Sequence, residues 1–133
     1  LNPSDGVHYD SRSTIAGYME KYNPDEYEFR VDDRMKRLIA AEDWGRWGEK
    51  GTLCVNFLTD NDITGGNSGS PVLDGRGRLI GLAFDGNRES MAGDVWFHPD
   101  LARTVCVDIR YVMWIIDKYA EADWLLDEVK FEK

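Results

Sequence analysis

A serine set among glycines is the clearest chemical signal in this sequence. Residues 64–71 read TGGNSGSP and contain Ser68. A nucleophilic serine needs an exposed hydroxyl and backbone N–H groups that face the oxyanion formed when it attacks a carbonyl carbon. The N–H groups of Gly66 and Ser68 are the expected donors, and Gly69 permits the tight path that follows. We therefore predict acyl-transfer chemistry with Ser68 as the nucleophile.

This run has two other interpretations. The Gly-x-Ser-x-Gly elbow of α/β hydrolases does not fit, because position 70 is Ser and the run leads into a predicted strand instead of a helix. The simpler interpretation is a glycine-rich turn in which Ser68 only caps the backbone. The nucleophile remains the favoured hypothesis.

The elements that must position Ser68 are predicted strands. Apolar runs of strand length, bounded by Gly, Asp or Asn, occupy residues 53–58, 70–73, 79–84 and 104–108. Asp74-Gly75 is typical of a hairpin turn between two of them. Ser68 then lies in the loop that joins two strands of an antiparallel sheet.

Helices are predicted on either side of these strands. Residues 1–50 form a polar lead-in with short helical segments at 11–21 and 32–41, and Asn23-Pro24 breaks the chain between them. Residues 51–110 hold the strands. In residues 111–130 apolar side chains recur at helical spacing, which predicts one terminal helix. The expected fold class is mainly β, antiparallel, with a closing helix.

Length and charge exclude several classes of protein. The 133 residues, 42% of them hydrophobic, suffice for one compact core, so we predict a single domain. A formal net charge of −9 disfavours nucleic acid as a partner. No apolar run approaches the roughly 18 residues of a membrane helix, so no membrane partner is expected. The missing initiator Met suggests a piece of a longer chain.

Two cysteines, Cys54 and Cys106, each lie within an apolar run. Their spacing matches neither a zinc site nor a redox Cys-x-x-Cys motif, so no metal site is expected and both are predicted to be buried. A disulfide between neighbouring strands stays open, because sequence does not give the distance between them.

The motifs resemble a known family. The GNSGSP run at 66–71 is similar to the active-site run of chymotrypsin-fold peptidases. FDGN at 84–87, SMAGD at 90–94, RT at 103–104, VDIRYV at 107–112 and GYMEK at 17–21 look like the C-terminal region of the bacterial dipeptidyl-peptidase 7 and dipeptidyl-peptidase 11 family of serine peptidases. Several separated motifs occur in the same order, so the resemblance covers most of the chain.

The resemblance implies a fold that this chain only partly contains. Family members have a chymotrypsin-like double β-barrel and a separate helical domain, and residues 1–133 would be the second, C-terminal antiparallel barrel with its terminal helix. The catalytic His and Asp of such enzymes precede the Ser and lie on the first barrel, outside this sequence. His8 and His98, the only histidines here, are expected at the surface and not as the general base.

The resemblance also assigns substrate-binding residues. Asp85 would bind the free amine of the substrate, and Gly86 would line the pocket for the side chain before the cut. Family members that prefer acidic side chains carry Arg at this position, so Gly86 implies a preference for apolar or aromatic residues. Arg88, two residues further along the predicted strand, could face the same pocket and favour Asp or Glu instead. A turn that merely ends the strand is the alternative for residues 85–87.

One departure from the usual pattern of the fold lies directly before the predicted nucleophile. Asn67 replaces the Asp that animal digestive members of the fold carry before the nucleophile, so activation by docking of a freed N-terminus is not expected. The implied chemistry needs no metal and no cofactor.

The function expected from these observations is release of dipeptides from peptide N-termini, in the periplasm or at the surface of a Gram-negative bacterium. Peptides with a free N-terminus and the missing barrel and helical domain are the expected partners, and the oligomeric state, a homodimer included, stays open. The chain alone should be inactive. The alternatives are an acidic-residue-preferring dipeptidyl-peptidase, an endopeptidase of the same fold, and a non-catalytic peptide-binding module.

Overall fold

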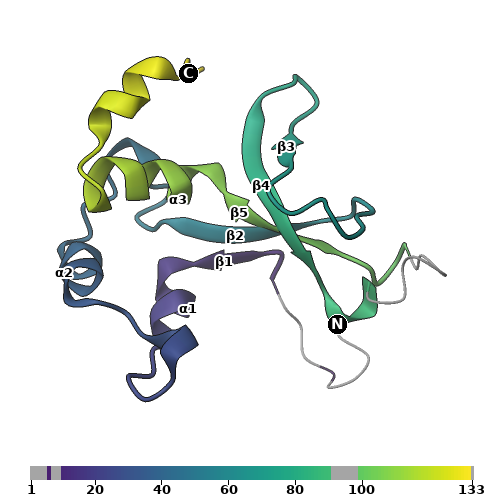
Figure 1. The fold of residues 1–133 in the computed structure, drawn as a ribbon, viewed down its shortest axis with the longest axis horizontal. Helices are drawn as coiled ribbons and strands as arrows, with labels where there is room; N and C mark the ends of the chain where they lie inside the picture. Colours follow the sequence, from purple (N-terminus) through teal and green to yellow (C-terminus); the bar gives the residue numbers. More distant parts are fainter. Residues whose placement is uncertain (1–5, 7–9, 91–98, 133) are drawn as a thin grey trace.

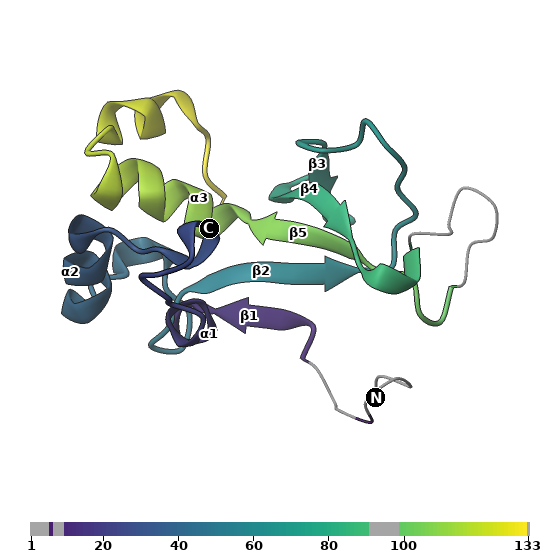
Figure 2. The same cartoon turned by 60° about the horizontal axis from the view of Figure 1, so that its bottom comes forward.

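A five-stranded antiparallel sheet forms the centre of the molecule (Figures 1 and 2). The computed structural model describes residue 6, residues 10–90 and residues 99–132. The strand order is β1-β2-β5-β4-β3, and every neighbouring pair is antiparallel. The strands are β1 Arg12–Thr14, β2 Cys54–Thr59, β3 Pro71–Leu73, β4 Leu79–Gly86 and β5 Thr104–Asp108.

The α-helices are short and gather at one end of the sheet, on the left of Figures 1 and 2. The α-helices are α1 Ile15–Glu20, α2 Asp33–Ala41 and α3 Ile109–Trp114. One π-helical turn, η4 Ile115–Tyr119, continues α3 directly. The 3-10 turns are η1 Tyr27–Phe29, η2 Gly45–Trp47, η3 Arg88–Ser90 and η5 Asp123–Glu128.

The four predicted strands are confirmed as β2, β3, β4 and β5; half of their ends match the prediction, and the others shift by one or two residues. In β5 the buried residues Thr104, Cys106 and Asp108 alternate with partly exposed valines, as the two faces of a strand require. The predicted hairpin joins β3 to β4. The carboxylate of Asp74 stabilises it by accepting hydrogen bonds from the N–H groups of Arg76 and Arg78, at 2.8 and 3.0 Å.

The expected closed barrel is not seen among the described residues. Strands β1 and β3 are the two edges of the sheet, and each pairs with a single neighbour. Each edge strand contains only three residues, and pairing is interrupted by a register shift at Ser13/Thr14 in β1 and at Val72/Leu73 in β3. The described part of the chain is therefore an open sheet, mainly β, with helices at one end.

The predicted helix at 32–41 is confirmed as α2. Asp32 caps it, because its side chain accepts a hydrogen bond from the N–H of Met35 at 2.9 Å. The predicted helix at 11–21 is only partly correct: residues 12–14 form strand β1, and α1 begins at Ile15. Pairing of β1 with β2, a partner distant in sequence, overrides the local helical preference.

The single terminal helix predicted for residues 111–130 is wrong in its second half. The chain runs through α3 and η4 and then breaks before η5. Glu121 lies at the break with a φ of 51°, a left-handed conformation that ends helical hydrogen bonding. The apolar spacing continued past this point, which is why the sequence pattern did not reveal the break.

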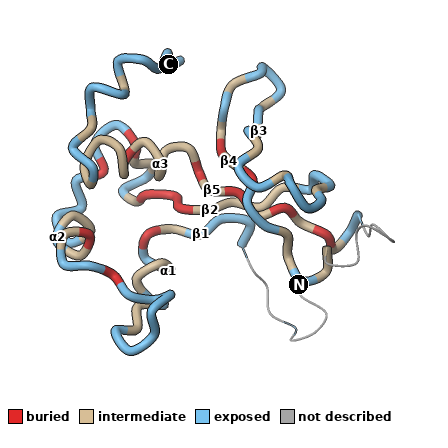
Figure 3. The backbone as a smooth tube through the Cα atoms, viewed as in Figure 1, coloured by how far each residue is buried: buried red, intermediate tan, exposed pale blue. Residues whose placement is uncertain are grey.

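The main core lies between the sheet and the helices (Figure 3). Leu53 and Trp114 are completely buried within it. The indole of Trp114 packs against that of Trp44, with ring centroids 5.7 Å apart, and donates a hydrogen bond to the carbonyl of Asp43 at 3.0 Å. This core holds the helical end together, whereas the loop that carries Ser68 leaves the opposite end of β2 (Figure 2). Within the described part of the chain, no helix has the length and apolar character to cross a membrane.

Candidate active site

The predicted nucleophile, Ser68, lies exposed in the loop between β2 and β3. Asn67 braces this loop: its side-chain oxygen accepts a hydrogen bond from the N–H of Thr64 at 2.9 Å, and its carbonyl accepts one from the N–H of Ser70 at 2.9 Å. Asn67 therefore stabilises the turn from within. Position 67 therefore needs a side chain that can accept a hydrogen bond from the backbone.

The loop is also fastened to β4 on its C-terminal side. The N–H of Gly69 donates to the carbonyl of Ala83 at 2.7 Å, and the N–H of Ala83 donates to the carbonyl of Ser70 at 2.9 Å. These two bonds extend the β3–β4 ladder up to the residue that follows Ser68. Ser68 is thus positioned by the sheet, not by a free loop.

Two glycines give this loop its path. Gly66 has a φ of 100° and Gly69 a φ of 86°, values that residues with a side chain rarely adopt. A Cβ atom at either position would meet nothing within 4 Å. Glycine is therefore needed here for backbone conformation and not for space. Within the described residues, the N–H groups of Gly66 and Ser68 donate no hydrogen bond, so both are available to an acceptor.

The hydroxyl of Ser68 faces strand β4. Its Oγ donates a hydrogen bond to the carbonyl oxygen of Phe84 at 3.2 Å. Phe84 is the extra residue of a β-bulge, because Ala83 pairs with Cys106 and Asp85 already pairs with Val105. Bulges beside active sites redirect backbone and side-chain groups. Sequence reasoning missed Phe84, since a bulge leaves no mark on the alternation of apolar residues.

A cavity of about 250 Å³ opens beside Ser68. The loop and β4 supply its walls, and it brings Asp85 and Gly86 to the same site as Ser68. The described residues that line it are Ile63, Thr64, Gly65, Ser68, Phe84, Asp85, Gly86 and Ser90. Of these, Ser90 was part of a motif in the sequence but was given no function there. Its four-residue distance from Gly86 could have suggested a turn that returns to the pocket.

Asp85 and Gly86 are the last two residues of β4. Asp85 is exposed, and its Oδ1 accepts a hydrogen bond from the N–H of Gly86 at 2.8 Å. Among the described residues no donor contacts Oδ2, which leaves one carboxylate oxygen for a cation. Because both residues belong to β4, the alternative that they only form a turn after the strand is wrong.

Arg88 is not one of the described residues that line this cavity. The expectation that it shares a strand face with Gly86 is wrong, because β4 ends at Gly86 and Arg88 begins the 3-10 turn η3. Asn87 causes this ending: its side chain accepts from the N–H of Arg103 at 2.8 Å and donates to the carbonyl of Leu101 at 2.7 Å. The chain therefore turns away from the strand direction before Arg88.

The remaining candidates from the sequence take no part in this site. His8 and His98 lie outside the described residues. Cys54 and Cys106 are buried and free, without a disulfide. Burial raises the pKa of the Cys54 thiol to about 11, so it stays protonated and unreactive at neutral pH. In the described part of the chain, His, Cys, Asp and Glu form no group that could hold a metal ion.

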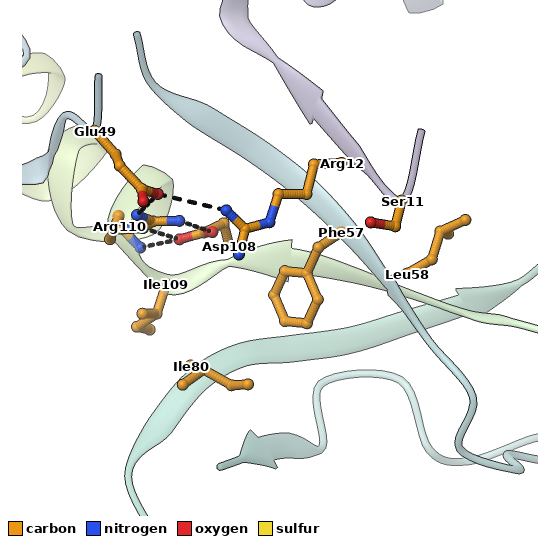
Figure 4. Close-up of a pocket in the computed structure, with 9 residues that line it drawn as sticks. All are labelled: Ser11, Arg12, Glu49, Phe57, Leu58, Ile80, Asp108, Ile109 and Arg110. Atoms are coloured by element: carbon orange, nitrogen blue, oxygen red, sulfur yellow. Dashed lines mark hydrogen bonds and ion pairs between the residues drawn. The ribbon is translucent and has the colours of Figure 1, made fainter. Parts of the chain in front are cut away.

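A second cavity, of about 500 Å³, shares no lining residue with the first (Figure 4). Arg110 dominates its polar wall. The guanidinium donates to both carboxylate oxygens of Asp108, at 2.9 and 2.8 Å, and to Glu49 at 2.6 Å. Burial alone would raise the pKa of Asp108, but hydrogen bonds from Arg110 outweigh it and hold that pKa below its ordinary value. The charges pair with one another, so the buried Asp108 carboxylate is not left without a partner.

Comparison with known proteins gives consistent matches over nearly the whole chain. A sequence profile described as Peptidase S46 matches residues 1–131. The chain is 52% identical over 128 residues to a dipeptidyl-peptidase 7 of Porphyromonas gingivalis. The aligned part covers 96% of this chain and 18% of that protein. It is 47% identical over 134 residues to an Asp/Glu-specific dipeptidyl-peptidase of Capnocytophaga gingivalis. This alignment covers 100% of this chain and 19% of that protein.

A solved structure matches the fold equally well. The crystal structure of Porphyromonas endodontalis DPP11 in complex with the dipeptide Arg-Asp superposes with a TM-score of 0.93 at 44% identity, over 98% of this chain and 19% of that one. The chain therefore spans about a fifth of the length of the relatives it matches.

Proposed function

Because this chain belongs to the peptidase S46 family, we propose that it is the nucleophile-bearing part of a serine dipeptidyl-peptidase. The observation that carries the proposal is the position of Ser68, exposed in a fastened loop at the mouth of a cavity and hydrogen-bonded to β4. The rest of the enzyme lies in the part of the protein that this chain does not span.

The proposed reaction is acyl transfer to water. The Oγ of Ser68 attacks the second carbonyl carbon of the peptide, and its proton passes to a histidine outside this chain. The tetrahedral intermediate collapses as the peptide C–N bond breaks, and the leaving amine takes up that proton. Water then hydrolyses the dipeptidyl ester, which releases the dipeptide and restores the Ser68 hydroxyl. No cofactor or metal is needed for these steps.

Two backbone N–H groups are proposed to stabilise the oxyanion. Those of Gly66 and Ser68 flank the attacking residue, and neither is used elsewhere in the described structure. Fixed N–H donors stabilise a developing negative charge because they need no reorganisation during the reaction. The left-handed backbone at Gly66 supports this function, since it turns the chain sharply just before Ser68.

Asp85 is proposed to bind the N-terminal ammonium of the substrate. The residue lines the cavity beside Ser68, and one of its carboxylate oxygens is unpaired within the described residues. A carboxylate next to an ammonium forms a charge-assisted hydrogen bond, the strongest kind available to neutral-pH side chains. Such a contact would restrict cleavage to peptides with a free N-terminus.

The pocket is proposed to accept an apolar or aromatic side chain before the cut. None of the described residues that line it is Lys or Arg, so it offers no cation to a carboxylate. The chain is also more similar to the dipeptidyl-peptidase 7 above, at 52% identity, than to the Asp/Glu-specific enzyme, at 47%. The names of the Asp/Glu-specific relatives favour an acidic preference as the second candidate.

The whole enzyme is proposed to have a chymotrypsin-like double barrel, with residues 1–133 as the second barrel. The two free edges, β1 and β3, are those that closure of this sheet would have to join. The first barrel would supply His and Asp. By extension of the family resemblance, we place the enzyme in the periplasm or at the surface of a Gram-negative bacterium.

The test is hydrolysis by the full-length protein of dipeptide substrates with a chromogenic leaving amine. Ser68→Ala should reduce kcat by about a millionfold, the loss seen when a serine nucleophile is removed. Ser13→Ala is the matched control, because Ser13 is an exposed residue of β1. Equal hydrolysis by the Ser68→Ala variant and the wild type would overturn Ser68 as the nucleophile, and absence of hydrolysis by the wild type would leave the peptide-binding module as the explanation.

A further inference from the structure

The space beside Gly86 is already occupied. A Cβ atom at Gly86 would overlap the Oγ of Ser90 and lie 3.3 Å from its Cβ. Both residues line the cavity beside Ser68. Ser90 therefore fills the volume that a side chain at position 86 would take.

Ser90 is held in this position by two hydrogen bonds to one acceptor. Its N–H and its Oγ both donate to the carbonyl oxygen of Asn87, at 3.0 and 2.7 Å. Asn87 is fixed in turn, because its backbone N–H donates to the carbonyl of Arg103 at 2.9 Å and its side chain binds the backbone of residues 101 and 103. Rotating the Ser90 hydroxyl away from Gly86 would break a short hydrogen bond, and the Ser90 Cβ would remain close.

The orientation of the Ser90 hydroxyl also determines what it offers the pocket. Its hydrogen is used in the bond to Asn87, so the oxygen presents lone pairs to the cavity. Lone pairs accept hydrogen bonds but repel a carboxylate, which has no hydrogen to donate. The wall formed by Ser90 thus disfavours Asp and Glu side chains on the substrate.

We propose that Ser90 is a specificity-determining residue that acts jointly with Gly86. The Ser90 side chain forms the wall of the pocket that Gly86 leaves open, and position 86 can gain a side chain only when position 90 is shortened. The inference rests on the proposed function, namely that this cavity binds the side chain before the cut.

The test is a four-variant cycle in the full-length protein: wild type, Gly86→Arg, Ser90→Ala and the double variant. Each is assayed for kcat/KM on substrates with Leu or Asp before the cut. Gly86→Arg alone should lose Leu cleavage and gain less than threefold in Asp cleavage. The double variant should cleave the Asp substrate at least tenfold better than Gly86→Arg, because the guanidinium then has room in the pocket. Ser90→Ala alone should raise Asp cleavage relative to Leu cleavage, because it removes the lone pairs that repel a carboxylate.

Two controls separate this proposal from simpler explanations. Gly86→Arg combined with Ser13→Ala should behave as Gly86→Arg alone, because Ser13 lies on β1. The melting temperatures of Gly86→Ala and Gly86→Ala/Ser90→Ala test the contact without catalysis: the second substitution should recover stability that the first removes.

The outcomes are distinguishable. Equal Asp cleavage by Gly86→Arg and the double variant, with both folded, would overturn the coupling of positions 86 and 90 but not the peptidase function. Absence of dipeptide release by the wild type would overturn the proposed function and the specificity built on it. A lower melting temperature for Gly86→Ala/Ser90→Ala than for Gly86→Ala would show that the two side chains do not compete for space.

Discussion

The Oγ of Ser68 donates a hydrogen bond to the carbonyl oxygen of Phe84, the bulged residue of β4, at 3.2 Å. This bond joins the candidate nucleophile to the strand that carries the candidate substrate-binding residues. A shift of β4 would therefore act on Ser68 as well as on Asp85 and Gly86.

The isolated 133-residue chain should fold but not hydrolyse dipeptide substrates. Its core buries Leu53 and Trp114 completely, whereas a general base for Ser68 is proposed to lie elsewhere in the protein. Loss of the base from a serine peptidase lowers kcat by about a millionfold. Circular dichroism and a turnover assay on the purified chain would check both parts. Turnover that disappears in Ser68→Ala would place the base within these residues.

Replacing Asp85 with Asn in the full-length protein should weaken recognition of the substrate's free amine. We expect kcat/KM to fall about 30-fold, the scale of losing one charge-assisted hydrogen bond. Activity on an N-acetylated substrate should not change, because that substrate has no ammonium. Asp60→Asn, an exposed carboxylate outside the cavity lining, is the matched control. An equal loss on both substrates would argue against amine binding by Asp85.

Replacing Arg110 with Met should destabilise the isolated chain. Asp108 is 4% exposed and would keep a buried charge without its partner, at a cost of about 3 kcal/mol in the free energy of unfolding. Adding Asp108→Asn should recover part of this loss. Urea unfolding of the wild type and of the single and double variants measures these differences in the free energy of unfolding.

The pH dependence of the Arg110→Met variant provides a second check. In the wild type the pKa of Asp108 is lowered, so this group's contribution to stability is lost as pH falls. Without Arg110, burial would raise that pKa above its unfolded value, so the variant should lose stability as pH rises above about 4. The same trend with pH in both proteins would contradict the pairing.

The Asp74 carboxylate should make the β3–β4 hairpin acid-sensitive. Its side-chain hydrogen bond from Arg78 and the backbone N–H groups lower its pKa from 3.8 to about 2. Because the folded pKa is depressed, the stabilisation is complete above the unfolded value and disappears as pH falls from about 4 through 2. Asp74→Asn should therefore be less stable than wild type at pH 6 and equal to it near pH 2. Unfolding by urea across this range would test the difference.

Local pattern was enough to predict strands β2 to β5 and the glycine-rich loop that carries Ser68, because alternation and glycine spacing are properties of neighbouring residues. It missed features that depend on distant partners. Asn87 ends β4 by binding the backbone of residues 101 and 103, and β1 exists only because β2 pairs with it. The prediction that Arg88 continues the strand was wrong because Asn87 ends β4 before it. The Arg110 cluster was missed because Glu49 lies 61 residues away in sequence.

The closed barrel was expected from family resemblance and not from the residues themselves. Alternating apolar residues predict a sheet but not whether its two edges meet. Here the edges are the short strands β1 and β3, and neither contains enough residues to reveal its partner by pattern. The prediction of one terminal helix was wrong for a different reason. Glu121, with its left-handed backbone, interrupts the helix, whereas the apolar spacing continues on both sides of it.

The separation of β1 from β2 in sequence has a consequence for the order of folding. Strands β3 and β4 are joined by residues 74–78 and can pair on the microsecond timescale of a hairpin. Strand β1 must close a loop over residues 15–53, which contains α1 and α2, before it meets β2. Loop closure of this length costs entropy before any contact is gained. The sheet should therefore grow from the β3–β4 hairpin and receive its N-terminal strand last, so amide protons of β1 should be the last in the sheet to gain protection in pulse-labelling hydrogen exchange.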